Sequence, residues 1–112
     1  ARLAASRRIP ARLARDYDVV LTPTLSEVTP PIGHLDPTAE YDQVMSRLID
    51  WVGFTPLQNA SGAPAVSLPL AQSASGLPVG MMFGAAAGQE ATLLELAFEL
   101  EQEIGWPTLA AR

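Results

Sequence analysis

Two short apolar runs joined by a turn constrain the fold of this chain more than any other feature. The runs, APAVSLPLA and LPVGMMFGA, lie within residues 63–85 and are separated by QSASG. Val66 and Leu68 alternate with small or polar residues, which is typical of a strand with one apolar face. Two such runs around a Ser/Gly turn predict a β-hairpin. Gly80 and Gly84 in the second run indicate that another backbone or element approaches closely there.

After the hairpin the apolar residues recur at helical spacing. A broad apolar stripe is formed by Leu93, Leu94, Ala97, Phe98, Leu100 and Ile104. Five glutamates occupy most of the remaining positions, and Gly105 followed by Pro107 ends the pattern. The segment therefore predicts an amphipathic helix from Glu90 to about Ile104.

The amino-terminal part combines one helical segment with one strand. Residues 2–15 are rich in Ala, Leu and Arg and predict a helix, in which Pro10 either introduces a kink or starts a second helix. The apolar run from Val19 to Leu21 predicts a buried strand. Pro23 cannot donate a ladder hydrogen bond, so we expect it to end that strand.

A proline-rich stretch separates this strand from a second helix. Residues 26–42 contain three prolines and a glycine and predict an extended surface loop. Within it, Asp36 and Pro37 are typical of an N-cap and a first helical residue, which predicts a helix running to about Trp51. A single helical turn ending at Gly62 then leads into the hairpin. Helical and strand patterns together predict one α/β domain, because 112 residues leave no room for two cores.

The composition excludes several functions. Twelve acidic and seven basic residues give a net charge of −5, which argues against nucleic acid and anionic membranes as partners. Cysteine is absent, so neither a disulfide nor a thiolate metal site can form. There is no lysine and only one histidine, His34, which lacks a second ligand at helical spacing. No serine has the flanking glycines of a nucleophile elbow. The residues thus predict no catalytic group, no metal and no cofactor.

The order of several motifs resembles the carboxy-terminal part of the amidase signature family. The motifs are DVVLTPT, PPIG, FTPLQNASGAPAVSLPL, GLPVGMMFG and an acidic helix ending in ELEQEIGW. The resemblance is strongest from Asp18 to Trp106, and within the family it is to bacterial amidases of the 6-aminohexanoate cyclic-dimer hydrolase type. It implies that residues 1–112 are one carboxy-terminal segment of the amidase signature fold. In that segment helices would pack on part of a mixed sheet that includes the hairpin.

The resemblance also implies a function for the complete protein. Members of this family hydrolyse amides with a Ser-Ser-Lys triad through an acyl-enzyme. With no lysine present, the triad must lie outside this chain, so the chain alone is expected to be inactive. The implied partners are a small-molecule amide and the remainder of the amidase chain, in the cytoplasm, with a homo-oligomer left open. The alternative is a non-catalytic interaction or scaffold module that reuses this part of the fold.

Five residues are carried over as candidates for the wall of the substrate pocket. Ile32 and His34 lie in and beside the PPIG loop, and Trp51, Phe54 and Asn59 belong to WVGFTPLQN. The competing interpretation makes Trp51 and Phe54 ordinary core residues and His34 an exposed loop residue. Asn59 could instead cap or brace a loop.

Overall fold

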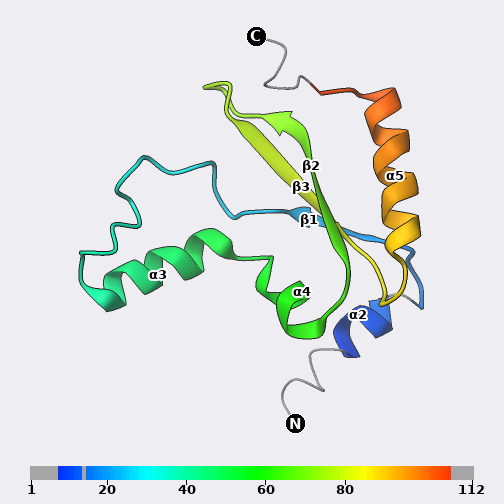
Figure 1. Cartoon of the computed structure of the whole chain (residues 1–112), viewed down its shortest axis with the longest axis horizontal. Helices are drawn as coiled ribbons and strands as arrows, with labels where there is room; N and C mark the ends of the chain where they lie inside the picture. Colours follow the sequence, from blue (N-terminus) through cyan, green and yellow to red (C-terminus); the bar gives the residue numbers. More distant parts are fainter. Residues whose placement is uncertain (1–7, 14, 107–112) are drawn as a thin grey trace.

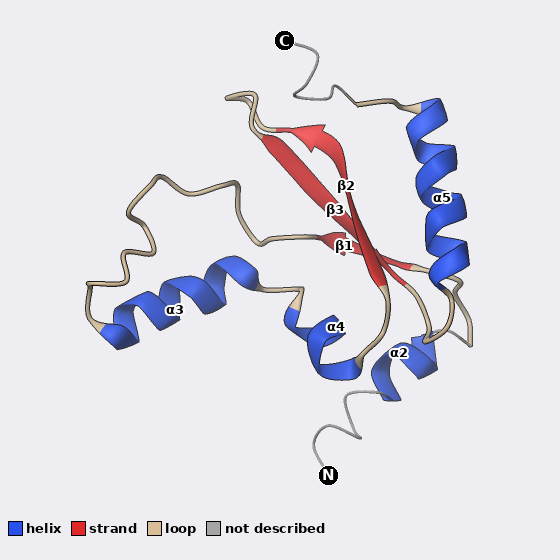
Figure 2. Cartoon of the chain, viewed as in Figure 1, coloured by secondary structure: helices blue, strands red, loops and turns tan. Residues whose placement is uncertain are grey.

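The computed structural model describes residues 8–13 and 15–106. Its elements are α2 (Arg8–Leu13), β1 (Val20–Pro23), α3 (Tyr41–Val52), α4 (Pro56–Ser61), β2 (Ala65–Gln72), β3 (Pro78–Gly84) and α5 (Glu90–Glu103) (Figure 1). The chain combines helices with a β-sheet, which confirms the α/β class (Figure 2). Of the helix predicted over residues 2–15, residues 2–7 and 14 lie outside the described residues, and Pro10 is the third residue of α2.

The three strands form one sheet in the order β1-β3-β2, and both pairings are antiparallel. The predicted β-hairpin is confirmed as β2 and β3, which are joined through a turn closed by Ser73. Its backbone N–H donates to the Leu77 carbonyl at 2.8 Å, and its hydroxyl accepts from the Leu77 N–H at 3.1 Å. The middle strand therefore belongs to the hairpin, and β1 and β2 are the edges.

The prolines of the two edge strands do not interrupt the ladder. The Thr24 N–H donates to the Gly80 carbonyl at 2.9 Å, so by the antiparallel alternation the missing N–H of Pro23 points away from β3. The expectation that Pro23 ends the strand is confirmed, because Pro23 is the last residue of β1, and its place there costs no ladder hydrogen bond. Pro69 lies where the register shifts between Leu68 and Ala71, a position at which a ladder donor is not required.

The core lies between one face of the sheet and α5. Its buried residues are Leu68, Phe83, Ala85 and Leu93, with Val66, Leu70, Met81, Leu96, Ala97 and Leu100 packed around them. These side chains come from alternate strand positions and from one face of the helix, as the periodicity predicts. The predicted burial of the run around Leu21 was wrong, since this side chain is 53% exposed. The reason is that β1 is an edge strand, whereas α5 packs mainly over β2.

The start of α3 differs from the sequence prediction by four residues. The helix begins at Tyr41, and the Glu40 side chain caps it by accepting from the Gln43 N–H at 3.2 Å. Asp36 instead forms a local turn, in which its Oδ1 accepts from the Thr38 N–H at 2.9 Å and from the Thr38 hydroxyl at 2.7 Å. A short acidic side chain bonds its own backbone more readily than it caps a distant helix. The predicted end of α4 at Gly62 is confirmed, with φ at 71°.

Candidate functional site

Four of the five candidate residues lie in a single excursion of the chain. Between β1 and α4 the backbone leaves the sheet, forms the long loop and α3, and returns to its starting point (Figure 1). The two ends meet where the Ser26 N–H donates to the Trp51 carbonyl at 2.9 Å. Gly53 follows with φ at 42°, and a Cβ at this position would collide with the Ser26 hydroxyl. We call residues 26–53 the α3 lobe; Phe54 follows it directly.

Ile32 and His34 lie in the loop half of the α3 lobe and differ in their burial. Ile32 is fully exposed, so it makes no packing contribution within the described chain. His34 is half-buried, and its carbonyl accepts from the Arg47 guanidinium at 3.0 Å. Arg47 thereby fastens the loop to α3, and its charge is directed at a backbone carbonyl.

Two aromatic candidates lie at the end of α3 and just after it. Trp51 is half-buried, and its indole Nε1 is shielded from solvent without an acceptor among the described residues. Phe54 is 37% exposed. Asn59, the fifth candidate, is exposed on α4, and its backbone N–H donates to the Thr55 carbonyl. The helix α3 itself buries none of its residues completely.

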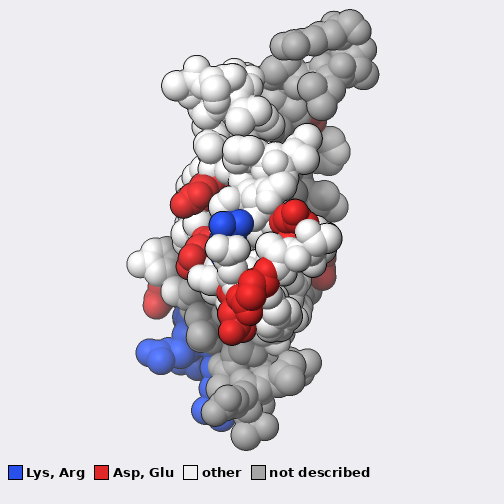
Figure 3. All heavy atoms as spheres, turned by 90° about the vertical axis from the view of Figure 1, so that its left-hand side faces the viewer, with Lys and Arg blue, Asp and Glu red and all other residues white. Residues whose placement is uncertain are grey.

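The α3 lobe is acidic. Between residues 26 and 53 the chain carries Glu27, Asp36, Glu40, Asp42 and Asp50 against the single cation Arg47. Figure 3 shows this end of the molecule, where acidic groups surround one basic group. Hydrogen bonds from the hydroxyl and then the backbone of Thr38 lower the pKa of Asp36 below its ordinary 3.8. The lobe thus offers carbonyl, aromatic and carboxylate groups, and its one cation, Arg47, already donates to the His34 carbonyl.

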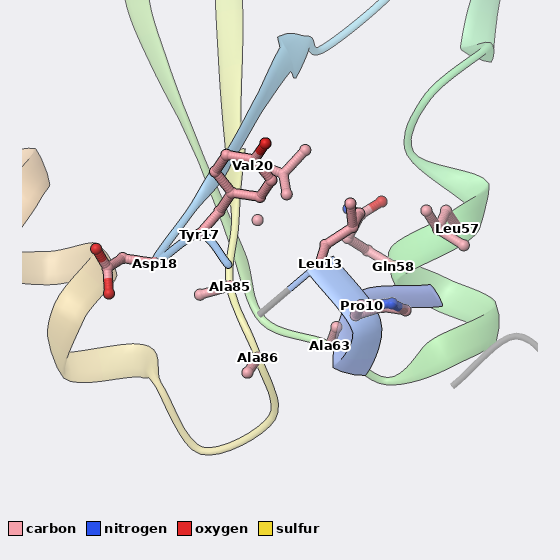
Figure 4. A pocket seen from close by; sticks show the side chains of 11 residues that line it. Pro10, Leu13, Tyr17, Asp18, Val20, Leu57, Gln58, Ala63, Ala85 and Ala86 are labelled. Atoms are coloured by element: carbon pink, nitrogen blue, oxygen red, sulfur yellow. The ribbon is translucent and has the colours of Figure 1, made fainter. Parts of the chain in front are cut away.

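A second feature, not predicted from the sequence, is a cavity between α2, α4 and the sheet. It has a volume of about 40 Å³, and Leu13, Val20 and Gln58 converge on it (Figure 4). The Gln58 Oε1 is buried without a hydrogen-bond donor among the described residues. A space of this size holds about one water molecule, whereas small-molecule sites occupy about 300–1,000 Å³. The cavity therefore cannot contain a substrate, and none of the five candidate residues lines it.

A third feature is a hydroxyl bridge across the sheet. The Thr24 and Ser67 hydroxyls lie 2.6 Å apart, and both are close to the backbone of Gly80. Ser67 is paired with Met82, and Thr24 lies two residues after Thr22, which is also paired with Met82. Paired residues and residues two apart share a face, so both hydroxyls lie on the sheet face away from Leu68. Strand alternation in the sequence could have predicted this shared face.

The described residues contain no catalytic base next to a nucleophile. No serine hydroxyl in this part of the chain is hydrogen-bonded to His34 or to a carboxylate. Among the described residues, the hydroxyl of the buried Ser61 bonds the backbone of Gln58 and of Ala63. The same residues contain no group of three or more metal-ligating side chains. In the described part of the chain there is also no helix with the length and apolar character needed to cross a membrane.

Comparison with known proteins identifies the family. The family model described as Amidase matches residues 1–94. The chain belongs to the amidase family. AmiC of Mycobacterium leprae is 63% identical over 105 residues, a region that makes up 94% of this chain and 22% of that protein. The 6-aminohexanoate-cyclic-dimer hydrolase of Paenarthrobacter ureafaciens is 35% identical over 96 residues, 80% of this chain and 20% of that protein. The amidase chain described here thus spans about a fifth of the length of these relatives.

Solved structures agree with this assignment. The structure of 6-aminohexanoate cyclic dimer hydrolase superposes with a TM-score of 0.78 at 29% identity, over 93% of this chain and 23% of that one. The glutamyl-tRNA(Gln) amidotransferase structure from Thermotoga maritima superposes with a TM-score of 0.70 at 23% identity, over 95% of this chain and 22% of that one. The second likeness establishes the fold alone. The predicted resemblance to the amidase signature family and to the cyclic-dimer hydrolases is therefore confirmed.

Proposed function

We propose that these residues are the carboxy-terminal segment of an enzyme that hydrolyses small-molecule amides. The observation that carries the proposal is the family match over residues 1–94 in a chain that spans about 22% of its relatives. Within the described residues, no serine is paired with a base, and the sequence has no lysine. The reactive groups therefore belong to the remainder of the polypeptide.

In the complete enzyme the reaction follows the Ser-Ser-Lys scheme. The lysine takes a proton from the bridging serine, which takes the proton of the attacking serine. That serine adds to the amide carbonyl, the amine leaves with a proton, and water releases the acid from the acyl-enzyme. Backbone N–H groups stabilise the oxyanion. This segment contributes no group to these steps and is inactive alone.

The segment's own part is to complete the sheet and to form one wall of the substrate pocket through the α3 lobe. Ile32 supports this role because a fully exposed isoleucine has no packing partner in the described chain. The shielded indole N–H of Trp51 also lacks an acceptor there. Since the lobe is acidic and Arg47 is engaged by the His34 carbonyl, the wall disfavours anionic substrates. We expect a neutral or cationic amide as the substrate, linear or cyclic, and a cytoplasmic enzyme.

An exchange experiment tests this function. In AmiC of Mycobacterium leprae, the region that matches this chain is replaced by residues 1–112, which gives the exchange protein. Hydrolysis of a panel of aryl and cyclic amides that unmodified AmiC cleaves is then measured, with the isolated 112-residue chain as the control. We expect the exchange protein to cleave these amides and the isolated chain to cleave none.

Two outcomes contradict the proposal. Activity of the isolated chain means that a catalytic group lies within it. A folded but inactive exchange protein favours the alternative, a non-catalytic interaction or scaffold module. In that case the isolated chain should also unfold cooperatively as a monomer.

A further inference from the structure

The outer side of α5 carries a second apolar stripe that the sheet does not cover. Leu93, Leu96, Ala97 and Leu100 face the core. Leu94 and Phe98 lie four residues apart and thus on a shared face of the helix. They are 57% and 63% exposed, and Ala91 precedes them by one turn and is also exposed. We call Ala91, Leu94 and Phe98 the outer stripe.

Acidic residues border the outer stripe without basic partners. The five glutamates of α5 are Glu90, Glu95, Glu99, Glu101 and Glu103, and all are exposed. None of them forms an ion pair with another described residue, and the last turn of α5 contains no basic side chain. Glu95 and Glu99 repel each other at i, i+4, and the carboxyl end of the helix dipole adds further negative potential. A surface that covers the outer stripe would therefore be stabilised by basic side chains at its border.

The size of the relatives indicates what covers this stripe. The chain spans 22% of AmiC of Mycobacterium leprae and 23% of the solved cyclic dimer hydrolase, so roughly three quarters of such a polypeptide lies outside it. An exposed leucine and phenylalanine at helical spacing, on a helix whose opposite face already fills a core, are typical of a helix held between two layers.

We propose that the outer stripe packs against the remainder of the amidase polypeptide, on an apolar surface bordered by arginine or lysine side chains. The inference rests on the proposed function, because it requires that this chain is a segment of a longer enzyme. α5 then lies between the sheet and a second layer, and Glu95 and Glu101, each three residues from Phe98 and so beside the outer stripe, gain the ion pairs that they lack in this chain.

Photo-crosslinking in the exchange protein tests the contact without measuring activity. Benzoylphenylalanine is incorporated in place of Phe98 and, as the control, in place of Glu103, which lies outside the outer stripe. After irradiation, crosslinked peptides are mapped by mass spectrometry. We expect the probe at position 98 to crosslink within one polypeptide to peptides outside the 112 residues, and the probe at 103 to do so much less.

The other outcomes overturn the proposal. A crosslinked dimer on a denaturing gel assigns the outer stripe to a second copy. Crosslinks only within the 112 residues, or none, show that no other layer covers it. Because mapping is independent of hydrolysis, a failed contact and a failed amidase function give different results.

A stability measurement provides a second test. The substitutions Leu94→Gln and Phe98→Gln together should lower the melting temperature of the exchange protein by at least about 3 °C, since burying two amides without partners is costly. Glu99→Gln and Glu103→Gln, which introduce the same residue on the same helix away from the outer stripe, should change it by less than about 1 °C. Equal small effects of the two pairs contradict the proposal.

Discussion

The hydroxyls of Thr24 and Ser67 lie 2.6 Å apart across the middle strand of the sheet, at the position of Gly80. A Cβ on Gly80 would lie 2.7 Å from the Thr24 hydroxyl and 2.9 Å from that of Ser67. The bridge between the two edge strands is thus possible because the strand between them has no side chain at this point.

Gly80→Ala should therefore destabilise the sheet. The added methyl group requires both hydroxyls to move, and overpacking of this kind costs about 1–3 kcal/mol. Thermal unfolding of the exchange protein measures the loss. In a background with Thr24→Ala and Ser67→Ala, which removes both oxygens, the same substitution should cost much less. An equal cost in both backgrounds would show that the hydroxyl contacts are not its cause.

Gly53→Ala should loosen the α3 lobe by more than backbone strain alone. The positive φ costs an L-residue about 1–2 kcal/mol, and the new Cβ also collides with the Ser26 hydroxyl. Gly33→Ala is the matched control, because Gly33 also has a positive φ, 93°, but no neighbour within 4 Å of the added Cβ. Limited proteolysis of the exchange protein should show faster cleavage in the lobe for Gly53→Ala than for Gly33→Ala. Adding Ser26→Gly should reverse part of the difference.

Ile32→Ala tests the pocket wall separately from stability. Since Ile32 is fully exposed in this chain, its truncation should leave the melting temperature unchanged unless another part of the enzyme covers it. If it contacts substrate, the loss of three carbon atoms should raise KM by about tenfold with little change in kcat. Val28→Ala, in the same loop at 48% exposure, is the control and should leave KM unchanged. Identical KM values for both variants would remove Ile32 from the wall.

The turn at Asp36 has a defined dependence on pH. Hydrogen bonds from Thr38 lower the pKa of the Asp36 carboxyl in the folded state. A lowered folded-state pKa means that its contribution to stability is present above the unfolded value and is lost as the pH falls through the folded value. Thr38→Val removes the hydroxyl donor and should raise the pKa toward 3.8, whereas Thr38→Ser should retain the lower value. Carboxyl chemical shifts recorded against pH measure both, and equal values for the two variants would contradict this assignment.

Local patterns in the sequence predicted the elements whose formation depends on neighbouring residues. The hairpin and α5 follow from strand alternation and helical spacing, and Gly62 ends α4 as expected. The start of α3 was misplaced because both Asp36 and Glu40 precede suitable donors, and sequence alone does not decide between them. The exposure of Leu21 depends on the order of the strands, which is a property of distant pairings.

Less of the candidate site than of the fold could be predicted from the sequence. The five pocket-wall residues came from a family resemblance, and the structure places four of them in or directly beside one lobe without enclosing them. Whether they line a pocket depends on side chains outside this chain, so that part stays a prediction. The buried position of Gln58 arises where α4 packs beside the end of β3, so it could not be read from nearby sequence. The bridge from Thr24 to Ser67 likewise joins residues 43 positions apart.

The hydrogen bond between Ser26 and Trp51 also affects how the sheet assembles. Pro23 and Met81 are paired across 58 positions of sequence, and the bond from residue 26 to residue 51 bypasses 25 of them. Since the entropic cost of closing a loop grows with the logarithm of its length, a preformed α3 lobe lowers the cost of joining β1 to the hairpin by about 0.5 kcal/mol. The lobe therefore favours, through chain entropy, the long-range strand pairing from which it projects.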